Sequence, residues 1–515
     1  MSATTETRLK PDRLLTMLGT ATVLTVLLAA CATPPAASGP QSPAGGAATA
    51  VPAATEPSKA TAAPAATEAP AATEAPTAAA AAAPASAGGA DIVTWYQYDE
   101  KNTDPKADEA VGNAYLRDNI PKFNQAFSGK LTWVNQPQQW QKMTTALVAA
   151  VQAGGEVPDL MHTGASSLPL YLKNGTVQDL TDWIKAQPWF GDLDTAAVTA
   201  CTGPDGKIYC VPVAEQPSLV FYWKDYFPNG YPKTADDFLK QASDLKTKNV
   251  YAITYFGSTA FDGDASSRYF WSVISSFGGS YDDGKGNLKL NTPANVKAVE
   301  FMRAVVAKGY SSDDVFLGDF KEENDLKGLD PNAPHAASLP TGIFGYRYIQ
   351  PVKSPNGTQY GKDFDPTGGP MLEAIAKGDM IVSSMFTGGD TKQPSCNLGV
   401  SSFVIPVGAK NPDGAKTYIN WIMDIKNGID WVQRPGGGFP ASKMFLQDKV
   451  FDTPFYKQAA AATAGICKPW TGSLVRVTEA QKIIASAIFD LIKTNPTADI
   501  ATTLGKADDE YNRNN

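Results

Sequence analysis

Hydrophobic and polar positions beyond residue 90 follow two alternating periods. A two-residue period rich in β-formers predicts strands, and apolar residues three and four apart predict amphipathic helices. The first expected elements are a strand at 91–98, a helix at 111–127, a strand at 131–135, a helix at 140–151 and a short apolar strand at 157–161. Pro121 is expected to kink or split the first helix, because it lacks a backbone N–H. This β-α-β-α-β rhythm predicts an α/β fold with a parallel sheet flanked by helices.

The same periods continue towards the C-terminus. Thr234 and Thr292 each precede a helical pattern, in which a threonine hydroxyl can accept a hydrogen bond from the first turn. Residues 311–370 are irregular and rich in Pro and Gly, and their pattern predicts no regular element. The remaining expected elements are strands at 219–223, 380–385 and 400–406, and helices after Thr234, from Pro293, at 371–377, from Pro412 and from about Thr478.

The N-terminal segment has the pattern of an export signal. Residues 14–30 are apolar and uncharged, with basic residues before them, which is typical of a secretory signal rather than a membrane span. Residues 28–31, Leu-Ala-Ala-Cys, resemble the lipobox of bacterial lipoproteins, which predicts cleavage before Cys31 and a lipid on it. The alternative is an uncleaved anchor helix. Either reading predicts an extracytoplasmic chain that is held at the cell membrane.

A low-complexity segment follows at residues 32–90. It consists mostly of Ala, Pro, Thr and Gly with a few Glu, and no aromatic residue occurs before Trp95. The hexad at 65–70 is repeated at 71–76. Such a segment cannot bury enough apolar surface to offset its ordering entropy. We therefore expect an unfolded tether between the membrane and a folded body.

Composition excludes several classes of function. The formal charge of −8 at pH 7 over 515 residues argues against nucleic acid or an anionic membrane face as the main partner. The chain has two histidines, His162 and His335, so a histidine-rich metal site or a Cys–His nucleophile pair has little to be built from. We expect no metal, no cofactor and no catalytic residue.

The cysteines predict disulfides. Besides Cys31 they are Cys201, Cys210, Cys396 and Cys467. An even set in an exported chain favours two bridges, with three possible connectivities. The turn at residues 204–206 favours a Cys201–Cys210 bridge across a hairpin, and Cys396 with Cys467 is then the pair that is left.

Blocks of sequence in a fixed order carry a family resemblance. They lie at 92–95, 140–160, 175–180, 206–212, 219–225, 376–380 and 405–406. In this order over residues 91–515 they resemble the family 1 extracellular solute-binding proteins of ABC importers, whose members bind maltose and other sugars. The stretch at 311–370 is longer than this resemblance leads us to expect.

The resemblance implies a two-lobe periplasmic-binding-protein-like fold with an interlobe hinge of crossing strands. Lobe one is expected to contain residues 91–213 plus about 399–438, and lobe two about 216–398 plus about 439–515. The crossings are expected near 213–215, 398–400 and 436–438. Function is implied likewise: a surface-anchored receptor captures a mono- or oligosaccharide and delivers it to ABC permease subunits. We expect a monomer that touches the membrane only through its lipid.

Eleven residues are candidates for the ligand site. In open α/β sheets, ligands bind beyond the carboxyl ends of strands. This rule and the resemblance select Trp95, Gln97 and Asp99 after the first strand, and His162 and Thr163 after the third. The resemblance adds Glu215 on a crossing strand, Arg268, Tyr269 and Trp271 at an aromatic subsite, and Phe386 as a stacking residue. Trp470 is a further candidate that could stack from the C-terminal segment. The alternative for the tryptophans is a place in the core, and for Glu215 a solvated hinge charge.

Other functions remain open at this point. The same fold could bind a polyamine, a peptide or a glycerol-phosphate compound. A phosphate would call for clustered arginines or a helix N-terminus in the cleft, for which Arg268 and Arg347 are the only hints. A secreted carbohydrate-active enzyme would need two carboxylates across one bond, which the sequence does not place.

Overall fold

The computed structural model describes residues 90–107, 109–318, 320–331 and 335–513. All of them belong to one structural unit of the chain. The expected signal sequence, Cys31 and the tether up to residue 89 lie outside the described residues. Within the described ranges no helix combines the length and the apolar character that a membrane crossing requires.

The described chain alternates strands and helices throughout. Its strands are β1 (Ala90–Tyr96), β2 (Leu131–Pro137), β3 (Leu160–Gly164), β4 (Val211–Trp223), β5 (Ser338–Gly342), β6 (Val352–Lys353), β7 (Gln359–Tyr360), β8 (Met380–Ser383), β9 (Cys396–Val404), β10 (Phe439–Pro440) and β11 (Cys467–Lys468). Its α-helices are α1 (Ala110–Ala126), α2 (Trp140–Gln152), α3 (Leu168–Asn174), α4 (Thr181–Lys185), α5 (Thr195–Ala200), α6 (Ala235–Thr247), α7 (Asp264–Ser276), α8 (Pro293–Ala307), α9 (Glu322–Lys327), α10 (Gly369–Lys377), α11 (Pro412–Ile422), α12 (Ile425–Trp431), α13 (Pro454–Thr463), α14 (Val477–Phe489) and α15 (Ile500–Asn512).

The first three strands form the expected parallel arrangement. β1 pairs with β2 on one side, where Ile92 lies opposite Trp133, and with β3 on the other, where Thr94 lies opposite Leu160. Helices α1 and α2 connect these strands in the chain. The α/β class predicted from the sequence is therefore confirmed.

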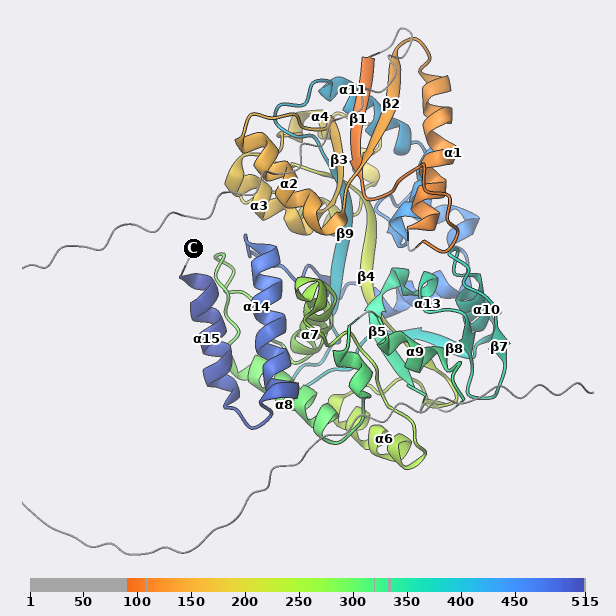
Figure 1. Cartoon of the computed structure of the whole chain (residues 1–515), viewed down its shortest axis with the longest axis vertical. Coiled ribbons are helices and arrows are strands. Elements are labelled where there is room, and N and C mark those ends of the chain that lie inside the picture. The colour runs from red at the N-terminus through yellow and green to blue at the C-terminus, as the bar shows by residue number, and fades with distance from the viewer. Residues whose placement is uncertain (1–89, 108, 319, 332–334, 514–515) are drawn as a thin grey trace, which may run out of the picture. The chain divides into compact units, whose positions relative to one another are not determined.

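Two long antiparallel strands connect this part of the sheet to a second lobe. β4 pairs with β9 from Val211 to Pro217, and with β5 and β8 from Ser218 to Trp223. Figure 1 shows β4 and β9 passing between the lobe with β1–β3 above and the lobe with β5 and β8 below. The structure thus confirms two lobes joined by crossing strands.

The crossing strands meet a third segment at two successive residues of β4, Ala214 and Glu215. Glu215 of β4 pairs with Val400 of β9 on one side and with Phe439 of β10 on the other. The segments near which the sequence predicts crossings are therefore neighbours at this point.

Local sequence signals explain where several helices begin. Thr234 accepts a hydrogen bond of 3.1 Å from the backbone N–H of Asp237 at the start of α6, and Thr292 accepts one of 3.2 Å from Asn295 in α8. α6 buries Ala235 and Phe238 in the first turn after this cap. Each cap satisfies one N–H that has no partner inside the helix, and both expected helices are confirmed.

Two regions of the described chain differ from expectation. α1 is not split but continues through Pro121, and its buried residues Tyr115 and Phe123 lie on both sides of that proline. Residues 311–370, expected to contain no regular element, contain α9, β5, β6 and β7, and the partner of β5, β4, lies far upstream in the chain. No local period reveals a strand that is defined by a distant partner, so the sequence missed β5.

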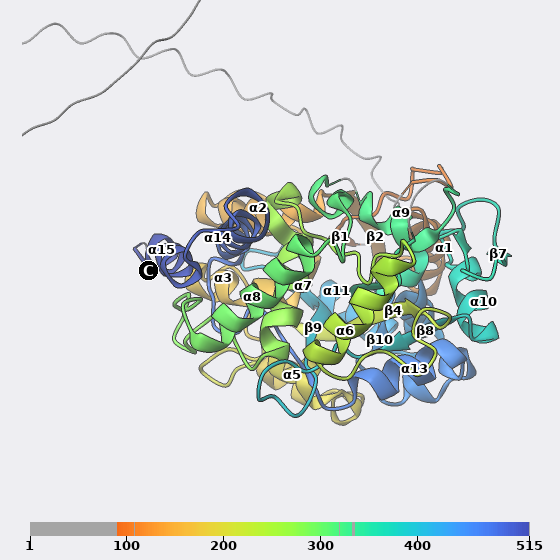
Figure 2. The same ribbon diagram turned by 90° about the horizontal axis from the view of Figure 1, so that it is seen from below.

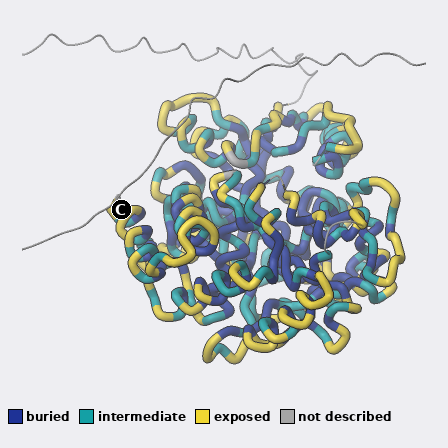
Figure 3. The backbone as a smooth tube through the Cα atoms, turned by 60° about the horizontal axis from the view of Figure 1, so that its bottom comes forward, coloured by how far each residue is buried: buried dark blue, intermediate teal, exposed yellow. Residues whose placement is uncertain are grey.

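Packing concentrates on the strands and the inner faces of the helices. Figure 3 shows a mostly buried interior with exposed residues on the outer turns. In the view from below, α6, α7 and α8 lie in front of the crossing strands (Figure 2), and α7 packs against both α8 and β9. This places one face of α7 beside the hinge.

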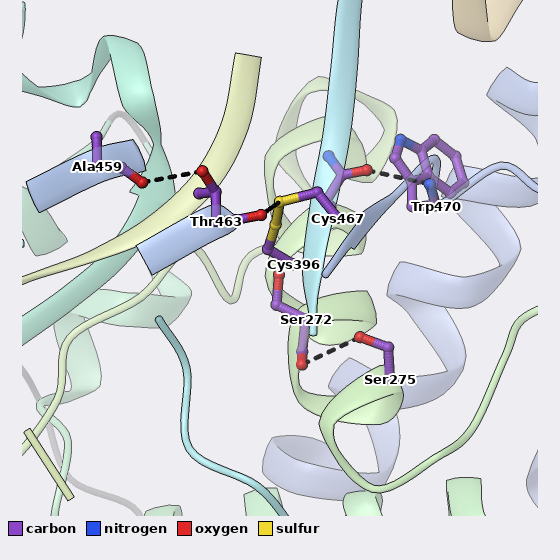
Figure 4. Close-up of a disulfide and its surroundings, with 8 residues drawn as sticks. Ser272, Ser275, Cys396, Ala459, Thr463, Cys467 and Trp470 are labelled. Atoms are coloured by element: carbon purple, nitrogen blue, oxygen red, sulfur yellow. Dashed lines mark hydrogen bonds between the residues drawn. A yellow bond between two sulfur atoms is a disulfide. The ribbon is translucent and has the colours of Figure 1, made fainter. Parts of the chain in front are cut away.

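Both expected disulfides are present. Cys201 and Cys210 are bridged across a hairpin, with Thr202 paired to Ile208 between them. The Cys396–Cys467 bridge joins β9 to β11, with a Cα–Cα distance of 4.4 Å (Figure 4). The second bridge therefore fastens a C-terminal segment to a crossing strand.

Candidate functional site

A large cavity lies beside the crossing strands. Its volume is about 2420 Å³, and its lining includes residues from β3, α7, β9 and the loop after β11. Both lobes therefore contribute to it, at the carboxyl end of β3 as the general rule for open α/β sheets requires.

The cavity brings together six of the eleven candidate residues. They are Gln97, His162, Thr163, Arg268, Tyr269 and Trp470. The other five, Trp95, Asp99, Glu215, Trp271 and Phe386, do not line it.

The residues after β1 divide between core and cavity. Gln97 lines the cavity, donates a hydrogen bond of 3.4 Å to Glu109, and has an Oε1 that accepts no hydrogen bond from any described residue. Trp95 is instead 9% exposed and donates from its indole to Gln136 of the neighbouring strand, at 3.2 Å. Asp99 accepts a hydrogen bond from the backbone of Lys101 and so stabilises a turn.

His162 is a deeply buried polar group in the cavity wall. It is 3% exposed, and five rings surround it: those of Tyr96, Tyr98, Trp140, Phe403 and Trp431. Burial lowers the pKa of His162 to about 3, so the imidazole is neutral at neutral pH. Neither ring nitrogen has a hydrogen-bond partner within the described part of the chain. A neutral imidazole offers one donor and one acceptor to a ligand.

Thr163 is already engaged within the protein. Its hydroxyl and that of Tyr171 are 2.9 Å apart, and its carbonyl accepts a hydrogen bond from Ser402 of β9. The residue therefore links β3 to the crossing strand while lining the cavity.

α7 presents one face to the cavity. Arg268 pairs with Asp264, and Tyr269 stacks on Tyr255 with ring centroids 4.2 Å apart. The cavity residues on this helix recur at helical spacing: Asp264, Ala265, Arg268, Tyr269 and Ser272. Trp271 lies off that face and is 5% exposed, so it is a core residue.

Phe386 is also a core residue. It is 1% exposed and packs against the rings of Phe238 and Phe301, at centroid distances of 5.2 and 5.0 Å. Its neighbours on both helices leave no face of the ring for a ligand, which corrects the expectation of a stacking role.

Glu215 differs from expectation by a single strand position. Its neighbours Gln216 and Ser218 line the cavity, and successive side chains of a strand point to opposite faces. Glu215 is half-buried, and its Oε1 has no hydrogen-bond partner among the described residues. Burial, assisted by the charge of Asp194, raises the pKa of Glu215 to about 8. It is therefore neither a solvated hinge charge nor a cavity residue.

Trp470 reaches the cavity from the loop after β11. It is 6% exposed, and its backbone N–H donates to Asn397 of β9 at 3.0 Å. Figure 4 shows Trp470 close to the Cys396–Cys467 bridge. The residue contributes to the core and the cavity at once.

The cavity also contains aromatic and polar residues that the sequence did not select. They include Tyr98, Gln216, Phe256, Phe320 and Phe344. Arg347, which the sequence offered only as a hint of phosphate binding, lines the cavity as well. Gln216 would have been found by the two-residue period once the register of β4 was known. The described residues contain no cluster of three or more His, Cys, Asp or Glu side chains that could bind a metal ion.

Comparisons with known proteins agree with this architecture. The sequence pattern of a family described as bacterial extracellular solute-binding protein matches residues 120–464, which is more than half of the chain. The chain belongs to this family. It is therefore an extracytoplasmic solute-binding protein and not an enzyme, as the sequence resemblance implied.

Solved structures share the fold of this solute-binding protein at low sequence identity. An ABC transporter solute-binding protein from Thermotoga lettingae TMO, bound with α-D-tagatose, has a TM-score of 0.64 at 15% identity, over 82% of this chain and 99% of its own. Maltose-bound MalE3 of T. maritima has a TM-score of 0.62 at 16% identity, over 83% and 100%. A solute-binding protein from Agrobacterium radiobacter K84, in complex with ribitol, has a TM-score of 0.62 at 18% identity, over 83% and 99%.

Proposed function

We propose that this solute-binding protein captures a mono- or oligosaccharide between its two lobes and delivers it to an ABC importer. The observation that carries the proposal is the make-up of the cavity beside the crossing strands. It combines His162 of β3 and Gln97, which follows β1, with Tyr269 of α7 and Trp470 of the loop after β11. Polar groups and aromatic rings thus face one space from both lobes.

This combination suits the chemistry of a sugar. The C–H face of a sugar ring is apolar and packs on an aromatic plane, for which Tyr269 and Trp470 are available. Sugar hydroxyls need donors and acceptors, because a buried polar group without a partner is costly. The nitrogens of His162 and Oε1 of Gln97 lack partners among the described side chains and backbone. Relatives of the same fold that carry tagatose, maltose or ribitol support a polyhydroxylated ligand.

Ligand binding would act by shifting the lobes from an open to a closed arrangement. Since β4 and β9 connect the lobes, bending within these strands changes the width of the cavity. A ligand that touches both lobes stabilises the closed arrangement by its differential affinity. The permease would then recognise the closed protein as the loaded one.

The proposal includes the anchor and the domain limits. Lipid on Cys31 and the tether at 32–90 would keep a monomeric receptor at the outer face of the membrane. The lobes would divide as the sequence suggests, with 91–213 and about 399–438 in one and about 216–398 and about 439–515 in the other. A Cys31→Ser variant should leave the membrane fraction and incorporate no labelled fatty acid, and persistence of either property would contradict the anchor.

The ligand class is tested by heating the full-length chain with a panel of compounds. Neutral mono- and oligosaccharides, polyols, polyamines, short peptides and glycerol phosphates form the panel. A ligand at a hundredfold over its Kd should add about 2.7 kcal/mol to the free energy of unfolding. We expect stabilisation by at least one sugar or polyol, with a smaller radius of gyration in scattering when that compound is bound. Stabilisation by polyamines or peptides alone would overturn the carbohydrate assignment.

A further inference from the structure

Arg347 is a buried cation in the wall of the cavity. It is 6% exposed and ends the 3₁₀ turn Ile343–Arg347, which follows β5 directly. Its Nη1 donates to the backbone carbonyl of Arg434, and its Nε donates to the hydroxyl of Tyr346 at 3.2 Å. Its Nη2 has no hydrogen-bond partner in the described ranges, and the guanidinium forms no ion pair there.

Three other arginines of the described chain form ion pairs, whereas the half-buried Arg303 donates to the backbone carbonyls of Leu491 and Ala498. Arg268 pairs with Asp264, Arg434 with Asp118 and Asp430, and Arg476 with Glu479. Arg347 is more buried than these three, yet its charge is balanced only by a carbonyl and a phenol. Glu109 lines the same cavity and accepts a hydrogen bond of 3.4 Å from Gln97.

Burial of a charge without a counter-charge is destabilising, because the protein replaces water poorly around an ion. An acidic group of a ligand would supply the missing counter-charge. Guanidinium binds carboxylate and phosphate with two parallel hydrogen bonds, and the unused Nη2 provides one of those donors. The rings of Phe344 and Tyr348, with centroids 6.2 Å apart, line the same cavity and can pack on the sugar that carries the acid.

We propose that Arg347 binds an acidic group on the carbohydrate, so that the ligand is a sugar acid or a sugar phosphate rather than a neutral sugar. This inference rests on the proposed function and adds the charge class of the ligand. A turn of the side chain about its own bonds would bring Nη2 to the cavity. This turn would break the hydrogen bonds to the carbonyl of Arg434 and to the hydroxyl of Tyr346, and water can satisfy both of those oxygens.

The test compares neutral and acidic members of matched pairs by calorimetry on the full-length chain. The probes are glucose with glucuronate and glucose 6-phosphate, galactose with galacturonate, and maltose with maltobionate. Inorganic phosphate and acetate are measured alone. At least one acidic member should bind ten times or more tighter than its neutral counterpart, and added salt should reduce that difference. The carboxylate and phosphate arms identify which acid is bound.

Variants assign the preference to Arg347. R347Q should lose at least tenfold in affinity for the acidic probe and leave the neutral probe unchanged, and R347K should recover part of the loss. R117Q is the matched control, because Arg117 also donates to one backbone carbonyl, that of Asn102, but lies outside the cavity. Melting temperatures and the retained neutral-sugar affinity show that R347Q is folded.

Each other outcome overturns the inference. If neutral sugars bind as tightly as their acids, or if R347Q weakens both alike, Arg347 is structural and the proposed function stands alone. If phosphate or acetate binds as tightly as the acidic sugar, the sugar is not recognised. If no sugar of either kind binds, the proposed function fails as well.

Discussion

The backbone N–H of Trp470 donates a hydrogen bond of 3.0 Å to the side-chain oxygen of Asn397, the residue after Cys396. Cys396 itself is bridged to Cys467 (Figure 4). Two successive residues of the crossing strand β9 thus fasten the loop that brings Trp470 to the cavity. The position of this ring relative to the hinge depends on both connections.

Replacing Asn397 with alanine should loosen that loop. The buried N–H of Trp470 would lose its acceptor, at a cost of about 1–3 kcal/mol. We expect a lower free energy of unfolding and weaker binding of the sugar that stabilises the protein most, measured by urea denaturation and calorimetry. Asn420→Ala is the matched control, because Asn420 accepts a hydrogen bond from the indole of Trp189 on the exposed surface. Equal ligand affinity in the two variants would contradict a positioning role for Asn397.

Removal of the two disulfides should have unequal effects. In the chain-entropy model, stabilisation grows with the length of the closed loop. The Cys396–Cys467 bridge spans 71 residues and the Cys201–Cys210 bridge spans 9. The model assigns about 4 kcal/mol to the longer loop and about 2.5 kcal/mol to the shorter. Double Cys→Ser variants measured by chemical denaturation test this order, and only the 396–467 variant should also lose ligand affinity.

His162 should make the protein less stable as the pH falls. Its pKa is about 3 in the folded protein and about 6.5 when unfolded. Between these values the unfolded chain binds a proton that the folded chain does not. The contribution of neutral His162 to the free energy of unfolding is therefore fully present above about pH 6.5. Below that pH it is lost at about 1.4 kcal/mol per pH unit. His162→Phe should flatten urea-derived stability between pH 4.5 and 7, whereas the half-buried control His335→Gln should change this slope less.

Glu215 should have the opposite effect at higher pH. Its pKa is raised to about 8 by burial and by Asp194, so the folded state retains a proton that the unfolded state has released above about pH 4.5. Stability should fall as the pH rises from about 4.5 to about 8. Glu215→Gln keeps the size and removes the charge, so it should be more stable than the original chain at pH 8.5 and similar to it at pH 4. If Glu215→Gln showed the same difference in stability from the original chain at both pH values, Glu215 would not be buried as an acid.

Local chemistry made part of the fold predictable. Thr234 and Thr292 predict helices because each capping hydroxyl and the backbone N–H that it satisfies lie within three residues of each other. The turn between Cys201 and Cys210 is equally local, and so the bridge across it could be expected. The order of sequence blocks then indicated two lobes, which the crossing strands confirm.

The site was less predictable because it depends on register and on distant partners. Gln216 and not Glu215 faces the cavity, a difference of one position that no sequence pattern decides before β9 is paired with β4. Trp271 and Trp470 are the same residue type, but α7 places the first in the core and the loop after β11 brings the second to the cavity. Arg347 lies after β5, in a stretch where the sequence shows no period at all.

A single strand, β4, is hydrogen-bonded to β9 at its beginning and to β5 and β8 at its end. A single truncation of the gene therefore cannot remove one lobe and leave the other intact. Each such truncation would leave part of β4 without its partner strands. Engineers who want to graft a reporter onto this receptor should insert it at outer turns such as residues 228–230, which do not line the cavity. The two lobes are therefore encoded as one unit that a single truncation cannot divide.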